Sequence, residues 1–280
     1  MPKGLSLHVG LNGIDPDHYR GWDGELYGAE PDADAMEQLA QSRGFDATKL
    51  LTRDATAEAV ISAIQDAAQQ LQRGDLFFLS FAGHGGQVPD LNDEELDRAD
   101  ETWLTYDRQL VDDELHFVWA RFRPGVRMIV VSDTCHGGAV TNARIVDEEL
   151  SPPVSTPSTT DTSSLGYRAM PMDVMKETYR SNQSLYDGIQ KALPSASSIE
   201  VDASLIAFLG CKDWQLAKDG WDNGLFTEKL LNVWGSGTWN GGHADFLEAI
   251  SSLMPDDQSP NYKPVGAANP TFERQQPFTI

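Results

Sequence analysis

Several stretches of the chain are almost continuously apolar, and each has the length of a β-strand. Five of the six residues from 126 to 131 (VRMIVV) are apolar, and most of these are β-branched. Segments 76–81 (LFFLSF), 5–11 (LSLHVGL) and 203–211 (ASLIAFLGC) follow a similar pattern. Strands of this composition are typically buried on both faces of a parallel sheet. We therefore predict that these segments form the centre of a mostly parallel sheet.

Between the apolar runs, hydrophobic residues recur every three or four positions, which predicts amphipathic helices. The clearest helix is 57–72, with Thr56 suited to cap its start and one apolar face: Val60, Ile61, Ile64, Ala68 and Leu71. Other helices are predicted at 31–43, 112–121, 225–234 and 244–253, and a short strand at 49–51. Residues 277–280 are either a last edge strand or a tail. Strands alternating with helices predict the α/β class.

The length of 280 residues suits one large α/β domain with a substantial core, and we expect a single domain over residues 1–280. The least regular stretch is 141–200. Its segment 151–166 (SPPVSTPSTTDTSSLG) is too rich in Ser, Thr and Pro to pack as a core. We therefore predict a mobile loop over residues 141–200.

The chain is strongly acidic, with 43 Asp and Glu against 21 Lys and Arg and a net charge of -22. Such a surface repels nucleic acid and attracts cations such as calcium or basic peptides. The simpler interpretation is that the acidic excess serves only solubility. No apolar run reaches the roughly eighteen residues of a membrane span, and the amino terminus lacks the apolar core of a secretion signal. We expect a cytoplasmic protein without nucleic-acid or membrane partners.

Two motifs that follow buried strands carry candidate chemistry. Cys135 follows the 126–131 run, and His84 follows the 76–81 run within the sequence GHGG. Ligands of open α/β sheets bind at the carboxyl ends of the strands, so both side chains are expected at one edge although 51 positions separate them. We predict that Cys135 is a nucleophile with His84 as its base, and that the amides of Gly85 and Cys135 face a developing oxyanion.

The sequences GHGG and SDTCHGG, separated by an acidic stretch and VDDEL, resemble the metacaspase branch of the caspase-like cysteine peptidases, including its bacterial members. Three further segments are similar to parts of that family: LYGAEPDADAMEQLAQSRGF (26–45), DETWLTYDRQLVDDEL (100–115) and GCKDWQLA (210–217). The Gln-Ala-Cys signature of animal caspases is absent. The resemblance implies a caspase-like three-layer α/β fold and a monomeric cysteine endopeptidase.

The resemblance also implies a pocket for a basic substrate side chain, formed by Asp32 and Asp133. Because side chains alternate along a strand, Asp133 shares a face with Cys135. Asp32 has a simpler interpretation as an acidic residue favoured near a helix start. The small polar residues of the family at neighbouring pocket positions are replaced by Ala29 and Ala82.

A calcium site is implied by the same resemblance. Asp100, Asp112 and Asp113 match the metal-binding aspartates of the family, and Asn142 stands in the place of a fourth ligand. Hard oxygen ligands on flexible loops suit calcium. Because Asn142 brings no charge, we expect weaker binding than at four aspartates. Asp112 also competes for a role as helix N-cap.

The resulting hypothesis is a calcium-assisted cysteine endopeptidase that cleaves proteins or peptides after Arg or Lys. Self-cleavage is also expected, since the irregular stretch carries basic residues: Arg144, Arg168, Lys176, Arg180 and Lys191. Two alternatives stay open. One is a caspase-fold regulatory or binding module with little turnover, and the other is a protease with a different specificity, although pocket aspartates would repel an acidic side chain. A regulatory protein partner is compatible with each of these functions.

Overall fold

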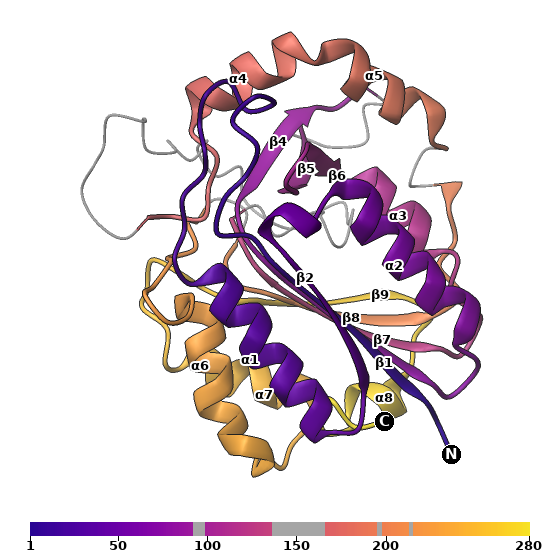
Figure 1. Cartoon of the computed structure of the whole chain (residues 1–280). Coiled ribbons are helices and arrows are strands. Elements are labelled where there is room, and N and C mark those ends of the chain that lie inside the picture. The colour runs from indigo at the N-terminus through magenta and orange to yellow at the C-terminus, as the bar shows by residue number, and fades with distance from the viewer. Residues whose placement is uncertain (92–98, 136–165, 195–197, 213–214) are drawn as a thin grey trace.

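A six-stranded sheet with helices on both faces organises the molecule (Figure 1). The computed structural model describes residues 1–91, 99–135, 166–194, 198–212 and 215–280. The strand order is β2-β1-β3-β7-β8-β9, and all neighbours are parallel except β9, which pairs antiparallel with β8. The strands are β1 (Gly4–Gly10), β2 (Asp46–Leu51), β3 (Leu76–Ala82), β7 (Arg127–Asp133), β8 (Ser204–Leu209) and β9 (Asn261–Gly266). The predicted α/β class with a mostly parallel sheet is confirmed.

The helices cover the two faces of this sheet unequally. One face carries α1 (Ala29–Ser42), α6 (Leu225–Trp234), α7 (His243–Ser251) and the short α8 (Pro270–Glu273). The other carries α2 (Ala57–Gln70) and α3 (Asp112–Trp119). Thr56 caps α2 as predicted, because its hydroxyl oxygen accepts a hydrogen bond from the Ala59 amide at 3.2 Å. Short 3-10 turns are formed by Thr52–Asp54 and Gly235–Gly237.

The central strands contribute side chains to two hydrophobic cores, one on each face of the sheet. On β7, Met128 and Val130 pack into the core under α2 and α3, whereas Ile129 and Val131 pack into the core under α1, α6 and α7. All four side chains are at most 1% exposed. Burying an apolar side chain of this size contributes roughly 1.5–3 kcal/mol. The prediction of strands buried on both faces is therefore confirmed.

A second, antiparallel sheet stands at the carboxyl edge of the first. It consists of β4 (Gly85–Pro89), β5 (Ala99–Leu104) and β6 (Gln109–Val111). Helices α4 (Met172–Ser181) and α5 (Gln183–Ala192) lie across this end of the molecule (Figure 1). The sequence pattern did not predict these short strands, because an acidic segment interrupts them.

The prediction of an irregular loop over residues 141–200 is wrong for α4 and α5. Helix α4 buries Val174 and Met175, and α5 buries Tyr186, so each has an apolar side that the flanking polar residues obscure in the sequence. Residues 136–165, with the Ser, Thr and Pro-rich segment, lie outside the described residues. The edge strands of the main sheet are β2 and β9, and residues 277–280 form a tail rather than a strand.

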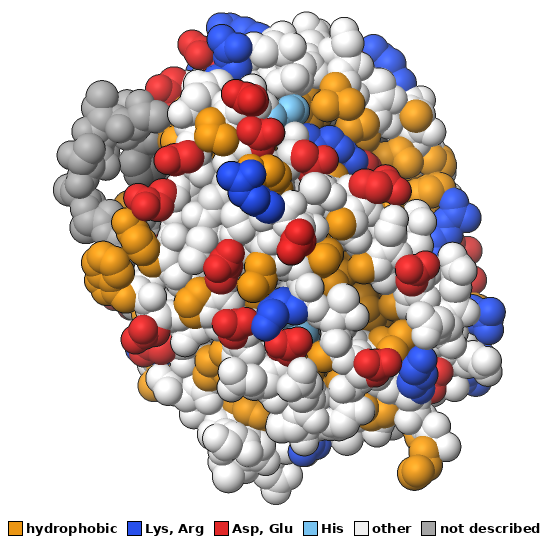
Figure 2. Space-filling view, in the orientation of Figure 1, with side chains coloured by type: hydrophobic (Ala, Val, Ile, Leu, Met, Phe, Trp, Pro, Cys, Tyr) orange, Lys and Arg blue, Asp and Glu red, His pale blue; other side chains and the backbone are white. Residues whose placement is uncertain are grey.

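Acidic side chains are spread over the face of the molecule drawn in Figure 2, with fewer Lys and Arg side chains among them. This distribution agrees with the net charge of -22. In the described part of the chain, every helix is too short or too polar to cross a membrane.

Candidate active site

The two predicted catalytic side chains follow neighbouring strands at matching positions. Ala82 on β3 pairs with Asp133 on β7, and His84 and Cys135 each come two residues later. The two motifs touch at Gly85, where an added Cβ would lie 1.8 Å from the carbonyl oxygen of Cys135. Only glycine fits there, because no real Cβ approaches backbone so closely. The structure thus brings His84, Gly85 and Cys135 to one edge of the sheet.

His84 is held by the loop after β1. Its Nε2 lies 3.1 Å from the carbonyl oxygen of Gly24, and Trp22 packs against the ring with centroids 4.7 Å apart. A carbonyl can only accept, so Nε2 carries the hydrogen of the neutral ring and the lone pair is on Nδ1. Within the described residues, Nδ1 is buried without a hydrogen-bond partner. Burial lowers the pKa of His84 to about 4.

The Cys135 thiol is fully buried and contacts the segment after β8. The Ala217 amide donates a hydrogen bond to Sγ at 2.9 Å. As far as the chain is described, no hydrogen bond joins this sulfur to His84. The thiol and the imidazole are therefore each held by backbone groups of neighbouring segments, and the predicted dyad is not joined by a direct bond.

A segment of the chain itself, residues 166–170, crosses the site in an extended conformation. The Asp219 amide donates to the carbonyl oxygen of Gly166 at 2.9 Å, and the Arg168 amide donates to the carbonyl oxygen of Ala217 at 2.9 Å. These bonds pair the segment with residues 217–219 as a short antiparallel ladder. An extended peptide bound at a sheet edge is a common mode of peptide recognition.

The carbonyl group of Arg168 lies at the meeting point of the two motifs. Its oxygen accepts hydrogen bonds from the amides of Gly85 at 3.0 Å and Cys135 at 3.1 Å. Beyond it, the Met170 amide donates to the carbonyl oxygen of Gly85 at 2.9 Å. The peptide bond after Arg168 is therefore held on both sides, and its carbonyl faces two donors in the arrangement that stabilises a developing oxyanion.

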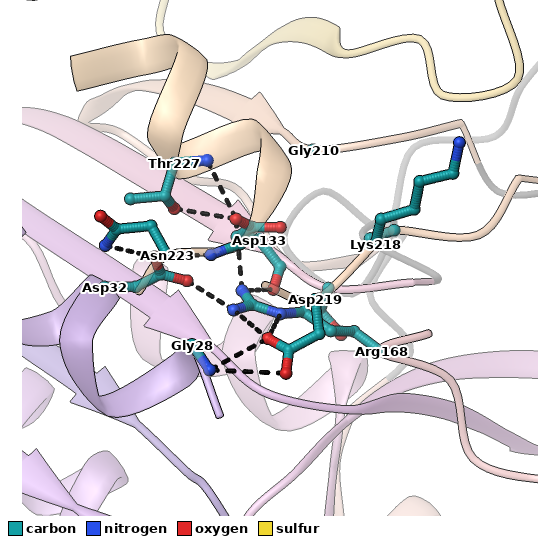
Figure 3. A network of polar contacts seen from close by, with 12 residues as sticks. Gly28, Asp32, Asp133, Arg168, Gly210, Lys218, Asp219, Asn223 and Thr227 are labelled. Carbon is teal, nitrogen blue, oxygen red and sulfur yellow. Dashed lines mark hydrogen bonds and ion pairs between the residues drawn. The ribbon is translucent and has the colours of Figure 1, made fainter. Parts of the chain in front are cut away.

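The Arg168 side chain fills a pocket of three carboxylates (Figure 3). Its guanidinium forms ion pairs with Asp32 at 2.6 Å, Asp133 at 3.2 Å and Asp219 at 2.9 Å, and all four side chains are at most 2% exposed. Burial alone would lower the pKa of Arg168, but the aspartates raise it above its usual value. Asp32 and Asp133, predicted as pocket residues, thus lie together around a basic side chain.

The amino terminus of α6 holds two of these carboxylates. Asp32 Oδ1 accepts from the Gly224 amide at 3.0 Å and from Nδ2 of Asn223 at 2.9 Å. Asp133 Oδ2 accepts from the amide and the hydroxyl of Thr227 at 3.0 and 2.8 Å. Unpaired amides and the helix dipole at this end favour negative charge. Asp32 and Asp133 are therefore also held by hydrogen bonds that do not involve the cation.

Electrostatics inside the pocket set the protonation of Asp32. Burial raises its pKa to about 7, the charge of Asp133 adds to the rise, and Arg168 partly offsets it. Removing the cation would raise this pKa further, since two like charges would then face each other. Gly224 completes the wall, because a Cβ there would lie 2.5 Å from Asp133 Oδ2 and 2.6 Å from Arg168 Cζ.

Sequence reasoning missed Asp219, Asn223, Gly224 and Thr227. The signal for Asp219 was available, since it lies two residues beyond the segment GCKDWQLA that resembles a family strand end. The residues 223–227 carry no motif of their own. They reach the pocket because α6 starts there.

The structure describes three of the four predicted metal ligands. Asp100 lies on β5 and Asp112 and Asp113 begin α3, with exposed fractions of 3%, 0% and 3%. Asn142 lies outside the described residues. Among the residues that the structure covers, no three His, Cys, Asp or Glu side chains are grouped so that they could hold a metal ion. The oxygen chemistry of these aspartates fits calcium.

Comparisons with known proteins identify relatives over most of the chain. The family model of the caspase domain matches residues 14–278. Metacaspase-1A of Aspergillus fumigatus is 35% identical over 152 residues, which are 49% of this chain and 35% of that protein. Metacaspase-1 of Mycosarcoma maydis is 28% identical over 247 residues, or 80% of this chain and 60% of that protein. The chain thus spans about a third of the length of the first of these relatives.

Two solved structures resemble the fold. Protein GSU0716 from Geobacter sulfurreducens superposes with a TM-score of 0.86 and 41% identity, covering 100% of this chain and 99% of that one. Caspase-1 from Spodoptera frugiperda superposes with a TM-score of 0.54 at 11% identity, covering 94% of this chain and 88% of that one. The second likeness concerns the fold alone, and it confirms the predicted caspase-like arrangement of sheet and helices.

Proposed function

Because the chain belongs to the family of caspase-domain peptidases, we propose that it is a cysteine endopeptidase that cleaves peptide bonds after Arg or Lys. The observation that carries this proposal is the position of Arg168. Its side chain fills a pocket of aspartates while its carbonyl oxygen accepts from the amides of Gly85 and Cys135. A substrate residue bound in the same way would present its carbonyl carbon beside the thiol.

In the proposed reaction, the Cys135 sulfur forms a bond to the carbonyl carbon and its proton passes to Nδ1 of His84. The Gly24 carbonyl supports this role, because it binds the hydrogen on Nε2 and so keeps the lone pair on Nδ1. The amides of Gly85 and Cys135 hold the negative oxygen of the tetrahedral intermediate. The same histidine then gives the proton to the leaving amine as the carbon–nitrogen bond breaks.

The second half-reaction releases the acyl group. A water molecule, deprotonated by His84, attacks the thioester carbon, and the carbon–sulfur bond breaks to leave a carboxylic acid and the free thiol. For this sequence to run, the sulfur must exchange its bond with the Ala217 amide for a position near Nδ1 of His84. The fully buried thiol makes such a change of side-chain position a requirement for turnover.

Self-cleavage is part of the proposal, and the bond between Arg168 and Ala169 is its first site. Supporting this choice, the hydrogen-bonded ladder already holds residues 166–170 in an extended conformation across Cys135. Intact mass after incubation, with and without calcium, should reveal fragments 1–168 and 169–280. Cys135→Ala and Arg168→Ala are the controls, and neither should yield this pair. Cleavage at another bond in wild type would contradict the assignment.

Calcium assistance is proposed for Asp100, Asp112 and Asp113, with Asn142 as the fourth ligand. The support is the burial of three carboxylates, one on β5 and two at the start of α3, whose oxygen atoms are of the kind that calcium prefers. No step of the reaction is assigned to the ion. Isothermal titration of calcium into wild type and Asp112→Asn tests this separately from turnover, and equal heats for both proteins would reject it.

Fluorogenic peptides ending in Arg, Lys or Asp test the peptidase proposal against its alternatives. We expect hydrolysis after Arg or Lys by wild type and none by Cys135→Ala. Hydrolysis after Asp would instead indicate a protease of different specificity, which the three pocket carboxylates disfavour. No hydrolysis of any peptide, even by a chain already cleaved at Arg168, would favour a regulatory or binding module.

A further inference from the structure

Asp219 contacts the guanidinium nitrogen Nε, whose place along a lysine side chain is taken by a methylene carbon. Asp219 Oδ1 accepts from Nε of Arg168 at 3.2 Å and from Nη2 at 2.9 Å. Asp32 and Asp133 contact only the two terminal nitrogens, Nη2 and Nη1. Each of the three carboxylates therefore contacts a different set of guanidinium nitrogens. Of the three, only Asp219 contacts Nε, the nitrogen nearest the aliphatic stem.

Three N–H groups of the guanidinium donate hydrogen bonds, and carboxylates surround the rest of the group. Nε and Nη2 donate to Asp219, and Nη1 donates to the carbonyl oxygen of Asp133 at 2.9 Å. Nη2 also makes an ion-pair contact with Asp32, and Nη1 makes one with the Asp133 carboxylate. A fully buried arginine depends on such partners, because each lost hydrogen bond or ion pair would lower the affinity.

A lysine in the same position would meet this pocket poorly. A carbon takes the place of Nε along the lysine stem, and the ammonium nitrogen takes the place of Cζ, one bond short of the terminal guanidinium nitrogens. Lysine has three donors where arginine has five. Its ammonium could keep a charge contact with the carboxylates, but a methylene group would stand where Nε–H donates to Asp219 Oδ1. Loss of a hydrogen bond between a charged donor and a buried carboxylate weakens binding.

Asp219 is also held by backbone groups, in addition to the cation. Its carboxylate accepts from the amide of Tyr27 at 2.8 Å and from the amide of Gly28 at 3.2 Å, just before α1 begins. An added Cβ at Gly28 would lie 2.9 Å from Asp219 Oδ1, so the backbone approaches this carboxylate closely (Figure 3). The Asp219 side chain cannot turn away from a poorly fitting substrate side chain without losing these two hydrogen bonds.

From these contacts we infer that Asp219 is a specificity-determining residue that makes the pocket select arginine over lysine. The inference rests on the proposed function, since it names the preferred side chain of the same site. Wild type should therefore cleave Arg peptides at least about tenfold more efficiently than matched Lys peptides, the effect of one lost interaction of this kind. Asp219→Ala should lose most of this ratio, because it lowers Arg cleavage more than Lys cleavage.

The test uses chains in which Arg168→Ala empties the pocket, so that the internal arginine does not compete. In this background, kcat/KM for matched Arg and Lys peptides is measured with Asp219→Ala, Asp32→Asn and Asp257→Ala. Asp32→Asn should weaken both substrates, because both cations approach Asp32. Asp257, which pairs with Lys218 at the surface, is the matched control, and its variant should leave the ratio unchanged.

Binding separates the inference from the proposed function. In Cys135→Ala/Arg168→Ala protein, isothermal titration with uncleaved Arg and Lys peptides reports the selectivity of the pocket without turnover. An Arg-to-Lys affinity ratio that falls in the Asp219→Ala version supports the inference even if the enzyme is inactive. A ratio near one before mutation, or the same ratio after it, overturns the inference while leaving the peptidase proposal standing. Thermal melting and circular dichroism establish that each variant is folded.

Discussion

His84 presents Nε2 to the carbonyl oxygen of Gly24 at a distance of 3.1 Å. Gly24 adopts a φ of +59°, and a Cβ there would lie 3.2 Å from His84 Cδ2, so a side chain at this position would crowd the ring. Because the carbonyl accepts from the neutral ring, this contact fixes which nitrogen is free to take a proton. The loop after β1 therefore contributes to the chemistry although it lies far from both motifs in the sequence.

The first prediction concerns the protonation of His84. Burial lowers its pKa to about 4, so its ring resonances should titrate near that value in an NMR experiment on Cys135→Ala protein. The resonances are assigned by their absence in His84→Gln. A midpoint near 6.5, the ordinary value, would show that the imidazole is solvated in the resting chain and would contradict this environment.

The same shift has a consequence for stability with a definite sign. Between pH 6.5 and about 4 the unfolded chain binds a proton at His84 that the folded chain excludes, so the free energy of unfolding falls as the pH falls through this window. His84→Gln should lose less stability over the window than wild type does. Denaturant unfolding at several pH values measures the difference.

The second prediction follows from Asp32. In the occupied pocket its pKa is about 7, raised chiefly by burial, and it must lose its proton to form the strongest ion pair with a substrate cation. The kcat/KM of the cleaved enzyme for Arg peptides should therefore rise as the pH increases through about 7 and above, since the empty pocket holds the proton more tightly. Asp32→Asn should abolish this rise with pH and lower the maximal kcat/KM. A profile identical in wild type and Asp32→Asn would contradict the assignment.

The third prediction concerns Gly224, which forms part of the pocket wall. A methyl group at Gly224 would overlap both Asp133 and Arg168, and overpacking of this kind costs about 1–3 kcal/mol. Gly224→Ala should therefore reduce kcat/KM for Arg peptides by about tenfold to a hundredfold. It should also lower the melting temperature of the uncleaved chain, and Arg168→Ala in the same protein should restore part of that loss.

Gly188→Ala is the matched control for this substitution. Gly188 lies within α5, and a Cβ there meets nothing within 4 Å. It should leave cleavage unchanged and slightly stabilise the helix, because alanine is the better helix former. Equal activity of Gly224→Ala and Gly188→Ala would show that the wall at Gly224 does not limit the space for substrate.

The sequence predicts the parts of this molecule that depend on local pattern. Buried strands such as β3 and β7 are recognisable because a short, continuous run of β-branched and aromatic residues is stable only where both faces are covered. Their parallel pairing then brings His84 and Cys135 to one edge. The partners that complete the pocket are different. Asp219 and Thr227 act through contacts with residues more than fifty positions away, and no local pattern reports such contacts.

Arg168 is a second example of a residue whose contacts no local sequence pattern predicts. It lies in a stretch without hydrophobic periodicity, which predicts an irregular segment and says nothing about where that segment binds. Its fully buried position arises from three aspartates contributed by α1, β7 and the segment after β8. A sequence pattern can identify acidic residues near a site, but only the folded chain shows which cation they hold.

The last prediction concerns access to the thiol. Cys135 is fully buried and packs in one small cluster with Ala169, Cys211 and Ala217, so residues 166–170 help to cover it. Arg168→Ala removes three buried ion pairs that anchor this segment. Alkylation of Cys135 by iodoacetamide should therefore be at least about tenfold faster in Arg168→Ala than in wild type, since each 1.4 kcal/mol of lost anchoring is about a factor of ten. Peptide mass spectrometry reads the modification of Cys135, and thermal melting of both proteins shows whether the fold as a whole has loosened. An unchanged rate at Cys135 would show that the Arg168 anchor does not control access to it.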